Sequence, residues 1–306
     1  MSSLNTPAVD TSELGLRYRP AICIFYFLIA AFVGLIVASV VMSFILAKGA
    51  TTPSLRIAAV TQDIFVFIVP AVVTAMVVSR LPARTLGVNC WVDGRLFFLA
   101  CALYVCATPL LEVVVKMNDA MSLPPVLADL EQWMRQMEEA ARSQVALLLG
   151  GDSVASLVVS ILIVGVMAGF SEELFFRGTL QRLIGASRLG PHMAIWVTAV
   201  LFSAFHMQFY GFFPRMLLGA YFGYLLWWSG SLWLPIAIHI LNNSIVVVSQ
   251  WAGAISDTPL TDGTFADSSG NMTLSFSSST LLIASLISSV ALIRLLVRRA
   301  HSMREC

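Results

Sequence analysis

The sequence predicts an all-α protein, a polytopic helix bundle that crosses a membrane about eight times. Of its 306 residues, 58% are hydrophobic and only 11% are charged, whereas about 25% are charged in a typical soluble domain. Apolar runs of about 20 residues, the length that spans a bilayer as a helix, recur along the whole chain. The net charge of +1 gives no basic field for nucleic acid, so we expect no nucleic-acid partner.

The predicted spans include the first apolar run, which is longer than a signal-peptide core of about 7–15 residues. We therefore interpret that run as a membrane anchor. The predicted spans cover residues 21–47, 57–79, 96–116, 154–176, 191–210, 212–228, 231–250 and 279–297.

The orientation follows from the Lys and Arg residues of the short loops, because cytoplasmic loops carry the excess. Eleven of them fall on the side of the two termini: Arg17, Arg19, Arg80, Arg84, Arg95, Arg182, Arg188, Arg294, Arg298, Arg299 and Arg304. Six fall on the other side: Lys48, Arg56, Lys116, Arg135, Arg142 and Arg215. We therefore expect a multi-pass protein of the cell membrane with both termini in the cytoplasm.

Two segments between the spans are predicted to lie on the outer side. Residues 123–147 have apolar positions at helical spacing with charges between them, which is typical of an amphipathic helix at a membrane surface. This helix could be a plain connector or a lid that gates substrate. Residues 256–278 contain no Lys or Arg and are rich in Ser, Thr, Asp and Gly, which predicts a loop.

Polar residues that can support chemistry occur at the ends of two spans and inside a third. Ionisable side chains within spans usually face the bundle interior and are functional candidates. They are Glu172, Glu173 and Arg177 near the end of the fourth span, His206 at the end of the fifth, and His239 with Asn243 in the seventh. The other polar residues within spans include Asp63 and Glu112, which we expect near the outer ends.

Helix geometry separates the roles of these residues. Glu173 and Arg177 are one turn apart and can form an ion pair. Glu172 is rotated by about 100° from Glu173, so it can point elsewhere and stay free. His239 and Asn243 are also one turn apart and share a face.

The free carboxylate, the two histidines and the amide suit hydrolysis. Glu172, with help from His206, could take a proton from water, while His239 and Asn243 could donate hydrogen bonds to an oxyanion. Each feature alone also has a structural explanation: an ion pair at a span end, a packed histidine, or an amide that bridges helices. Their combination in one chain favours chemistry.

These residues resemble the pattern of the CPBP intramembrane proteases, also described as type II CAAX prenyl endopeptidases. That pattern is Glu-Glu-x-x-x-Arg, then Phe-x-x-x-His, then His-x-x-x-Asn, on separate helices. Here it is Glu172 to Arg177, then Phe202 to His206, then His239 to Asn243. The resemblance covers roughly residues 165–250.

The resemblance implies a membrane-embedded endopeptidase whose site opens towards the cytoplasm. It implies that Glu172 and His206 activate water, that His239 and Asn243 form the oxyanion site, and that Glu173 and Arg177 support them. Whether a divalent metal such as zinc takes part stays open. Its ligands would be Glu172, His206 and His239 with an open fourth position, and a metalloprotease is the less favoured of the two mechanisms.

The resemblance also suggests how the chain is organised and what it acts on. Residues 1–153 would form N-terminal transmembrane helices with the outer amphipathic segment. Residues 154–306 would form the catalytic helical core with a C-terminal span. The expected substrate is a membrane-associated protein or peptide. Bacterial members of the family are linked to bacteriocin self-immunity, so a non-catalytic membrane binding or immunity protein is one alternative. A proton-coupled transporter is another.

The depths in the membrane that we expect for Glu172 and His206 do not agree with their meeting in one site. If the fourth span ends near residue 176, Glu172 lies close to the cytoplasmic face. His206, by contrast, lies about 20 Å from the start of its own span at 1.5 Å per residue.

Overall fold

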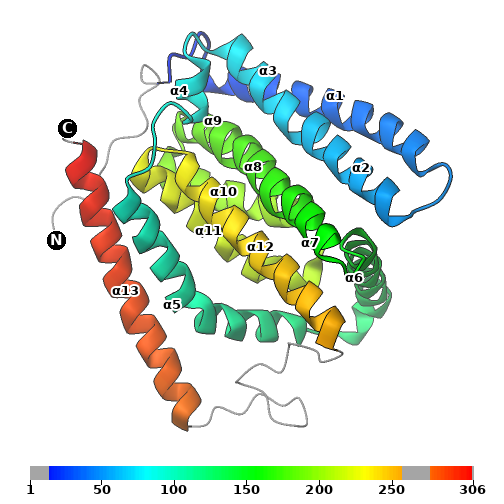
Figure 1. Cartoon of the computed structure of the whole chain (residues 1–306). Helices are drawn as coiled ribbons and strands as arrows, with labels where there is room; N and C mark the ends of the chain where they lie inside the picture. The colour runs from blue at the N-terminus through cyan, green and yellow to red at the C-terminus, as the bar shows by residue number, and fades with distance from the viewer. Residues whose placement is uncertain (1–13, 257–275, 305–306) are drawn as a thin grey trace.

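The computed structural model describes residues 14–256 and 276–304, and in these ranges helices are the only extended regular elements (Figure 1). The predicted all-α class is confirmed. Residues 257–275, which make up most of the predicted outer loop, lie outside the described residues. The predicted amphipathic segment is helical, as α6, Ala128–Leu148.

Among the described residues, eight long helical segments cross the bundle, and two of them change pitch along their length. The single helices are α1 (Pro20–Leu46), α5 (Gly94–Asp119), α10 (Gly190–Phe205), α11 (Phe212–Ser229), α12 (Trp233–Ser256) and α13 (Phe276–Arg304). The second segment runs through α2 (Thr52–Gln62), the π-helical η1 (Asp63–Ile68) and α3 (Val69–Val78). The fourth runs through α7 (Val154–Ser160), η3 (Ile161–Met167), α8 (Ala168–Glu173), η4 (Leu174–Gln181) and α9 (Arg182–Gly185).

Six of the eight segments are long and apolar enough to cross a membrane. The other two predicted spans, 191–210 and 212–228, correspond to α10 and α11. Helix α10 has 16 residues, which gives it a length of only about 24 Å. Helix α11 is not among the six candidates. The structure therefore supports a multi-pass membrane protein with six candidate spans.

The segments pack as neighbouring pairs around a central group (Figure 1). Helix α1 lies along α2 and α3, and α13 lies along α5. Between these two pairs, α12 packs against the α7–α9 segment, and α10 forms a hairpin with α11. The central group therefore contains all three parts of the predicted site.

Glycines allow the helices of the central group to approach closely. A side-chain carbon added at Gly165 or Gly169 would press on Ser244 or Ile240 of α12. One added at Gly223 of α11 would press on the Gln181 side chain. Paired small residues are typical of tight helix contacts in membranes.

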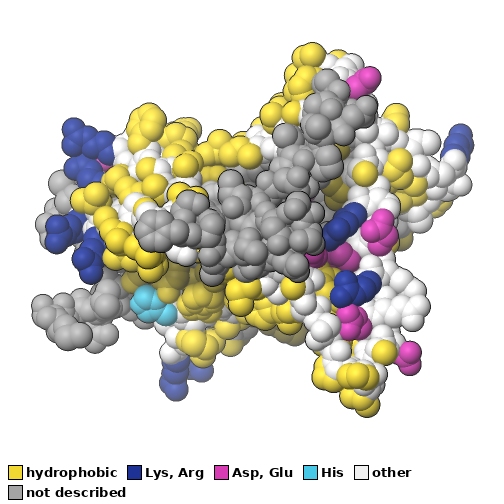
Figure 2. Space-filling view, turned by 90° about the horizontal axis from the view of Figure 1, so that it is seen from below, with side chains coloured by type: hydrophobic (Ala, Val, Ile, Leu, Met, Phe, Trp, Pro, Cys, Tyr) yellow, Lys and Arg dark blue, Asp and Glu magenta, His cyan; other side chains and the backbone are white. Residues whose placement is uncertain are grey.

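The two ends of the bundle differ in charge (Figure 2). We call one end the arginine-rich end; among the described residues it carries Arg17, Arg19, Arg80, Arg84, Arg95, Arg182, Arg188, Arg298 and Arg299. Asp93 is the single described carboxylate there, and Arg299 donates to it at 3.0 Å. This hydrogen bond lowers the pKa of the Asp93 carboxyl.

We call the opposite end the α6 end, and it mixes both signs of charge. Its described carboxylates are Glu112, Asp119, Asp129, Glu131, Glu138, Glu139 and Asp152. Several of them pair with the cations of the same end, such as Glu131 with Arg135 at 2.7 Å and Glu112 with Lys116 at 3.4 Å. Among the described residues, the excess of arginine over carboxylates therefore lies at the arginine-rich end.

The contact of α1 with the second segment gives a test of the packing. A methyl group added at Gly34 would clash with the Phe65 carbonyl oxygen, which is backbone and cannot move aside. We expect Gly34→Ala to destabilise the protein by about 1–3 kcal/mol, as overpacking does, and so to lower its melting temperature in detergent.

The matched control is Gly94→Ala, at the start of α5, where an added carbon meets nothing within 4 Å. That variant gains helix propensity without a clash and should melt at or above the parent temperature. Equal melting of the two variants would contradict the packing described for α1.

Candidate active site

A fully buried ion pair forms the base of the site. Arg177 donates from Nη1 to Oε1 of Glu173 at 2.7 Å, and both side chains are 0% exposed. Arg177 also donates from Nη2 to the Gly219 carbonyl oxygen at 2.9 Å. Its guanidinium lies 4.2 Å from the centre of the Phe202 ring, a cation–π geometry. The predicted pairing of Glu173 with Arg177 is confirmed.

The same carboxylate oxygen also fixes His239. Nδ1 of His239 lies 2.8 Å from Oε1 of Glu173. Because a carboxylate paired with arginine accepts hydrogen bonds, the His239 proton belongs on Nδ1. The ring is stacked on Phe222, with centres 4.7 Å apart. Sequence reasoning did not predict that Glu173 would hold His239.

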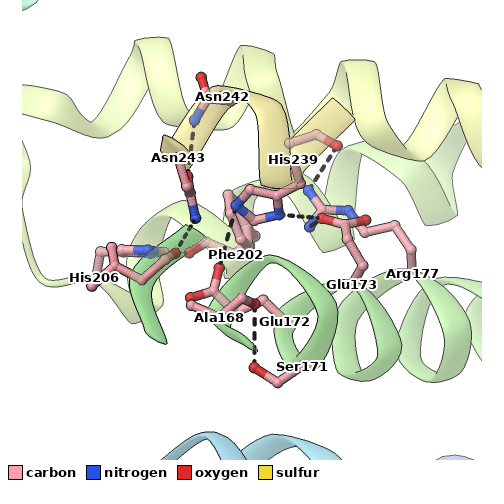
Figure 3. A network of polar contacts seen from close by, with 12 residues as sticks. Ala168, Ser171, Glu172, Glu173, Arg177, Phe202, His206, His239, Asn242 and Asn243 are labelled. Atoms are coloured by element: carbon pink, nitrogen blue, oxygen red, sulfur yellow. Dashed lines mark hydrogen bonds and ion pairs between the residues drawn. The ribbon is translucent and has the colours of Figure 1, made fainter. Parts of the chain in front are cut away.

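Glu172 lies on the other side of the His239 ring (Figure 3). Its Oε2 is 3.8 Å from Nε2 of His239, and its side chain is 14% exposed. The adjacent carboxylates therefore have different environments, as the rotation between them predicted. Glu173 is enclosed with a cation, and Glu172 faces a partly open space.

A chain of hydrogen bonds orients Asn243. The Tyr104 hydroxyl donates to Oδ1 of Asn242 at 3.0 Å, and Nδ2 of Asn242 donates to Oδ1 of Asn243 at 3.0 Å. Nδ2 of Asn243 then donates to the Val164 carbonyl oxygen at 3.1 Å. Since an amide nitrogen carries two hydrogens, one N–H of Asn243 remains for another acceptor.

His206 follows the last residue of α10, and its ring is also fixed through Nδ1. That nitrogen lies 2.9 Å from the Phe202 carbonyl oxygen. A carbonyl only accepts, so the proton is again on Nδ1, and Nε2 has a free lone pair. Glu172 and His239 are both close enough to His206 to interact with it electrostatically. The structure thus brings together all six residues that the sequence singled out.

The expected conflict of depth does not exist. Glu172 was expected near the end of its span, but the helical segment continues to Gly185. Glu172 therefore lies roughly 20 Å from the arginine-rich end, and His206 lies roughly 24 Å from the start of α10. The two residues meet because α10 stops at the depth of Glu172.

Asp63 is a polar neighbour of the site that was wrongly placed near an outer end. It lies midway along the α2–α3 segment, buried, and accepts a hydrogen bond from Ser171 at 2.9 Å. Its presence in an apolar run was a signal for an interior position. Ser171, Tyr104 and Asn242 carried no comparable signal, since single serine, tyrosine and asparagine residues are common in membrane helices.

The described residues contain no group of three or more His, Cys, Asp or Glu side chains arranged to hold a metal ion. The candidate ligand set of Glu172, His206 and His239 therefore does not form a ligand cage in this geometry. We route no chemical step through a metal.

The comparison with protein families agrees with the site. Residues 154–245 match the model of a family described as type II CAAX prenyl endopeptidase Rce1-like. This range contains all six site residues. The chain thus carries an Rce1-like domain of the type II CAAX prenyl endopeptidases, a family of proteases, and the resemblance noted from the motifs is confirmed. No curated protein and no solved structure matches the chain.

The buried ion pair leads to a prediction about stability. Glu173→Gln removes the charge that neutralises Arg177 and leaves the guanidinium buried without a counter-ion. Loss of one partner of a buried pair costs about 3–5 kcal/mol, so we expect less folded protein and a lower melting temperature in detergent.

Glu131→Gln is the matched control, because Glu131 pairs with Arg135 at the same spacing and the same distance, 2.7 Å, but at the surface. Surface pairs contribute little, so this variant should melt close to the parent. If both variants melted alike, burial would not be the reason why the Glu173–Arg177 pair stabilises the protein.

Proposed function

We propose that the protein is a membrane-embedded endopeptidase that hydrolyses peptide bonds of a membrane-associated protein or peptide. The observation that carries the proposal is the position of His239, held by Glu173 so that its Nε2 faces Glu172 at 3.8 Å. A partly open carboxylate, two histidines and an oriented amide surround one space. The match to a protease family supports the same reaction class.

In this proposal Glu172 is the general base. It accepts a proton from water while the water oxygen bonds to the carbonyl carbon of the substrate. His206 lies beside Glu172 with a lone pair on Nε2, and it assists the proton transfer. The same proton then passes to the nitrogen of the breaking C–N bond, which leaves as an amine.

His239 and Asn243 stabilise the oxyanion that forms when water adds. Asn243 donates from the second N–H of Nδ2, because the first N–H bonds to the Val164 carbonyl oxygen. His239 has its first proton on Nδ1, so it donates from Nε2 only as an imidazolium. The Glu173 carboxylate at 2.8 Å stabilises that cation, which gives Glu173 a supporting role in the chemistry as well as in the fold.

We also infer that both termini are cytoplasmic and that the protein lies in the cell membrane. The support is the arginine-rich end, where the described part of the chain begins and α13 ends (Figure 1). Cytoplasmic segments near span ends carry the excess of Lys and Arg.

The test of the proposed reaction is Glu172→Gln. The amide keeps the size of the side chain but cannot act as a base, so cleavage should fall by about 10²–10⁴-fold. Because no described Lys or Arg side chain forms an ion pair with Glu172, as Arg177 does with Glu173, the variant should express and melt at or above the parent level. Proteomics of membranes that contain the parent or the variant identifies the cleaved substrate, and purified protein then gives the rate.

Glu112→Gln is the matched control, since Glu112 also lies in an apolar helix and pairs with Lys116 outside the site. It should cleave like the parent. A Glu172→Gln protein that cleaves at the parent rate would refute the proposed base. If the parent generated no new peptide ends, a binding protein or a transporter would be the better explanation of the site.

A further prediction concerns metals. Because His206 and His239 are assigned to proton transfer and oxyanion binding, cleavage should survive a strong chelator. Elemental analysis of active protein should find no stoichiometric zinc. One zinc per chain, lost together with activity in His206→Ala, would overturn this assignment.

A further inference from the structure

Asp63 is a buried carboxyl group beside the site that the proposed reaction does not use. It lies at the start of η1, is 4% exposed, and accepts a hydrogen bond from Oγ of Ser171 at 2.9 Å. Among the described residues, no Lys, Arg or His forms an ion pair with it. A carboxyl group without a cation is costly in an apolar bundle, so its presence within a span indicates a role in function.

Three consecutive residues of α8 point in three directions, because successive positions of a helix are rotated by about 100°. Ser171 reaches Asp63, and in Figure 3 it points away from His239. Glu172 faces Nε2 of His239 at 3.8 Å, and Glu173 belongs to the buried ion pair. The direction of the Glu172 side chain therefore depends on the rotation of α8 about its own axis.

Helix geometry alone does not fix this rotation. Helix α8 has only six residues and lies between two π-helical segments, η3 and η4. A π-helix bonds residue i to residue i+5, so each change between α- and π-helix alters the directions of the side chains that follow. Contacts with neighbouring segments therefore help to set the rotation of α8. On one side, Gly169 packs closely on Ile240 of α12.

On the other side, the hydrogen bond between Ser171 and Asp63 joins α8 to η1. Ser171 also lies 3.2 Å from the Ala168 carbonyl oxygen of its own helix. Loss of the Asp63 carboxyl would therefore leave the Ser171 hydroxyl with an acceptor but would free α8 from η1. Asp63 is also close enough to Glu172 to interact with it electrostatically.

We propose that Asp63 is a positioning residue for the general base. Its hydrogen bond with Ser171 holds α8 in the rotation that directs the Glu172 carboxylate at His239. In this role Asp63 acts through Ser171 and needs no contact with the substrate. The proposal rests on the proposed function and adds to it a residue of the N-terminal helices, outside the range 154–245 that matches the protease family.

Replacement of the carboxyl group tests this role. Asp63→Leu removes the acceptor and places an apolar side chain in an apolar setting. Its kcat should fall about 10–100-fold, as it does when a reacting group is slightly misplaced, while KM and the melting temperature in detergent stay at the parent values. Asp63→Asn keeps an oxygen that accepts from Ser171 and should restore most of the rate. A merely structural contact would lower the melting temperature without separating kcat from KM.

Thr61→Val is the matched control. Thr61 is buried two residues earlier in the same segment, and its hydroxyl bonds within its own helix, to the Ile57 carbonyl oxygen at 2.8 Å. This variant should cleave like the parent. Asp63→Leu combined with Ser171→Ala should cleave no more slowly than Asp63→Leu alone, since both changes remove the same hydrogen bond. Parent-like cleavage by Asp63→Leu, or an Asp63→Asn protein as slow as Asp63→Leu, would overturn the proposal.

The ¹⁵N signal of Nε2 of His239 tests the orientation without any cleavage, because Glu172 faces that nitrogen. Asp63→Leu should move this signal in the same direction as Glu172→Gln does. An unchanged signal in the Asp63→Leu protein would refute the positioning role. If the parent cleaved no peptide, the proposed function would fail, and this signal would still decide whether Asp63 orients Glu172.

Discussion

The rest of the site depends on the burial of Arg177 in the middle of an apolar helix bundle. A guanidinium removed from water needs a counter-charge, and Glu173, one turn earlier, supplies it at 2.7 Å. Nη2 of Arg177 donates to the Gly219 carbonyl oxygen, and the Phe202 ring covers a face of the cation. These contacts join three segments of the bundle and fix their depth relative to one another.

The second consequence of this ion pair is the chemistry of His239. Glu173 accepts from Arg177 and from Nδ1 of His239 with one oxygen, so the charge that stabilises the fold also sets the tautomer of the histidine. Nε2 is then directed at Glu172. The same bonding pattern recurs at His206, whose Nδ1 is held by the Phe202 carbonyl. In the site, Nε2 of His239 thus faces Glu172, and His206 and Asn243 lie beside this pair (Figure 3).

Much of this arrangement could be predicted from spacing alone. The interval of four residues gave the Glu173–Arg177 pair and the shared face of His239 and Asn243, because helix geometry is local. The sequence could not show that Glu173 would also reach His239, since that contact joins residues 66 apart. The depth of Glu172 was misjudged because the apolar run ends near residue 176 while the helix continues to Gly185. Arg177 ends the apolar run in the sequence, but the helix continues through it. Two predicted spans fell short of the criteria for crossing because α10 stops within the bundle and α11 is less apolar.

The central claim is that Glu173 fixes the proton of His239 on Nδ1 and leaves Nε2 facing Glu172. The most direct measurement is ¹⁵N NMR of histidine-labelled protein in detergent micelles, with His239→Gln to assign the signals. The account predicts a protonated Nδ1 on His239 in the parent protein. A neutral ring with its proton on Nε2 would contradict it, because Glu173 would then face a nitrogen that has no hydrogen to donate.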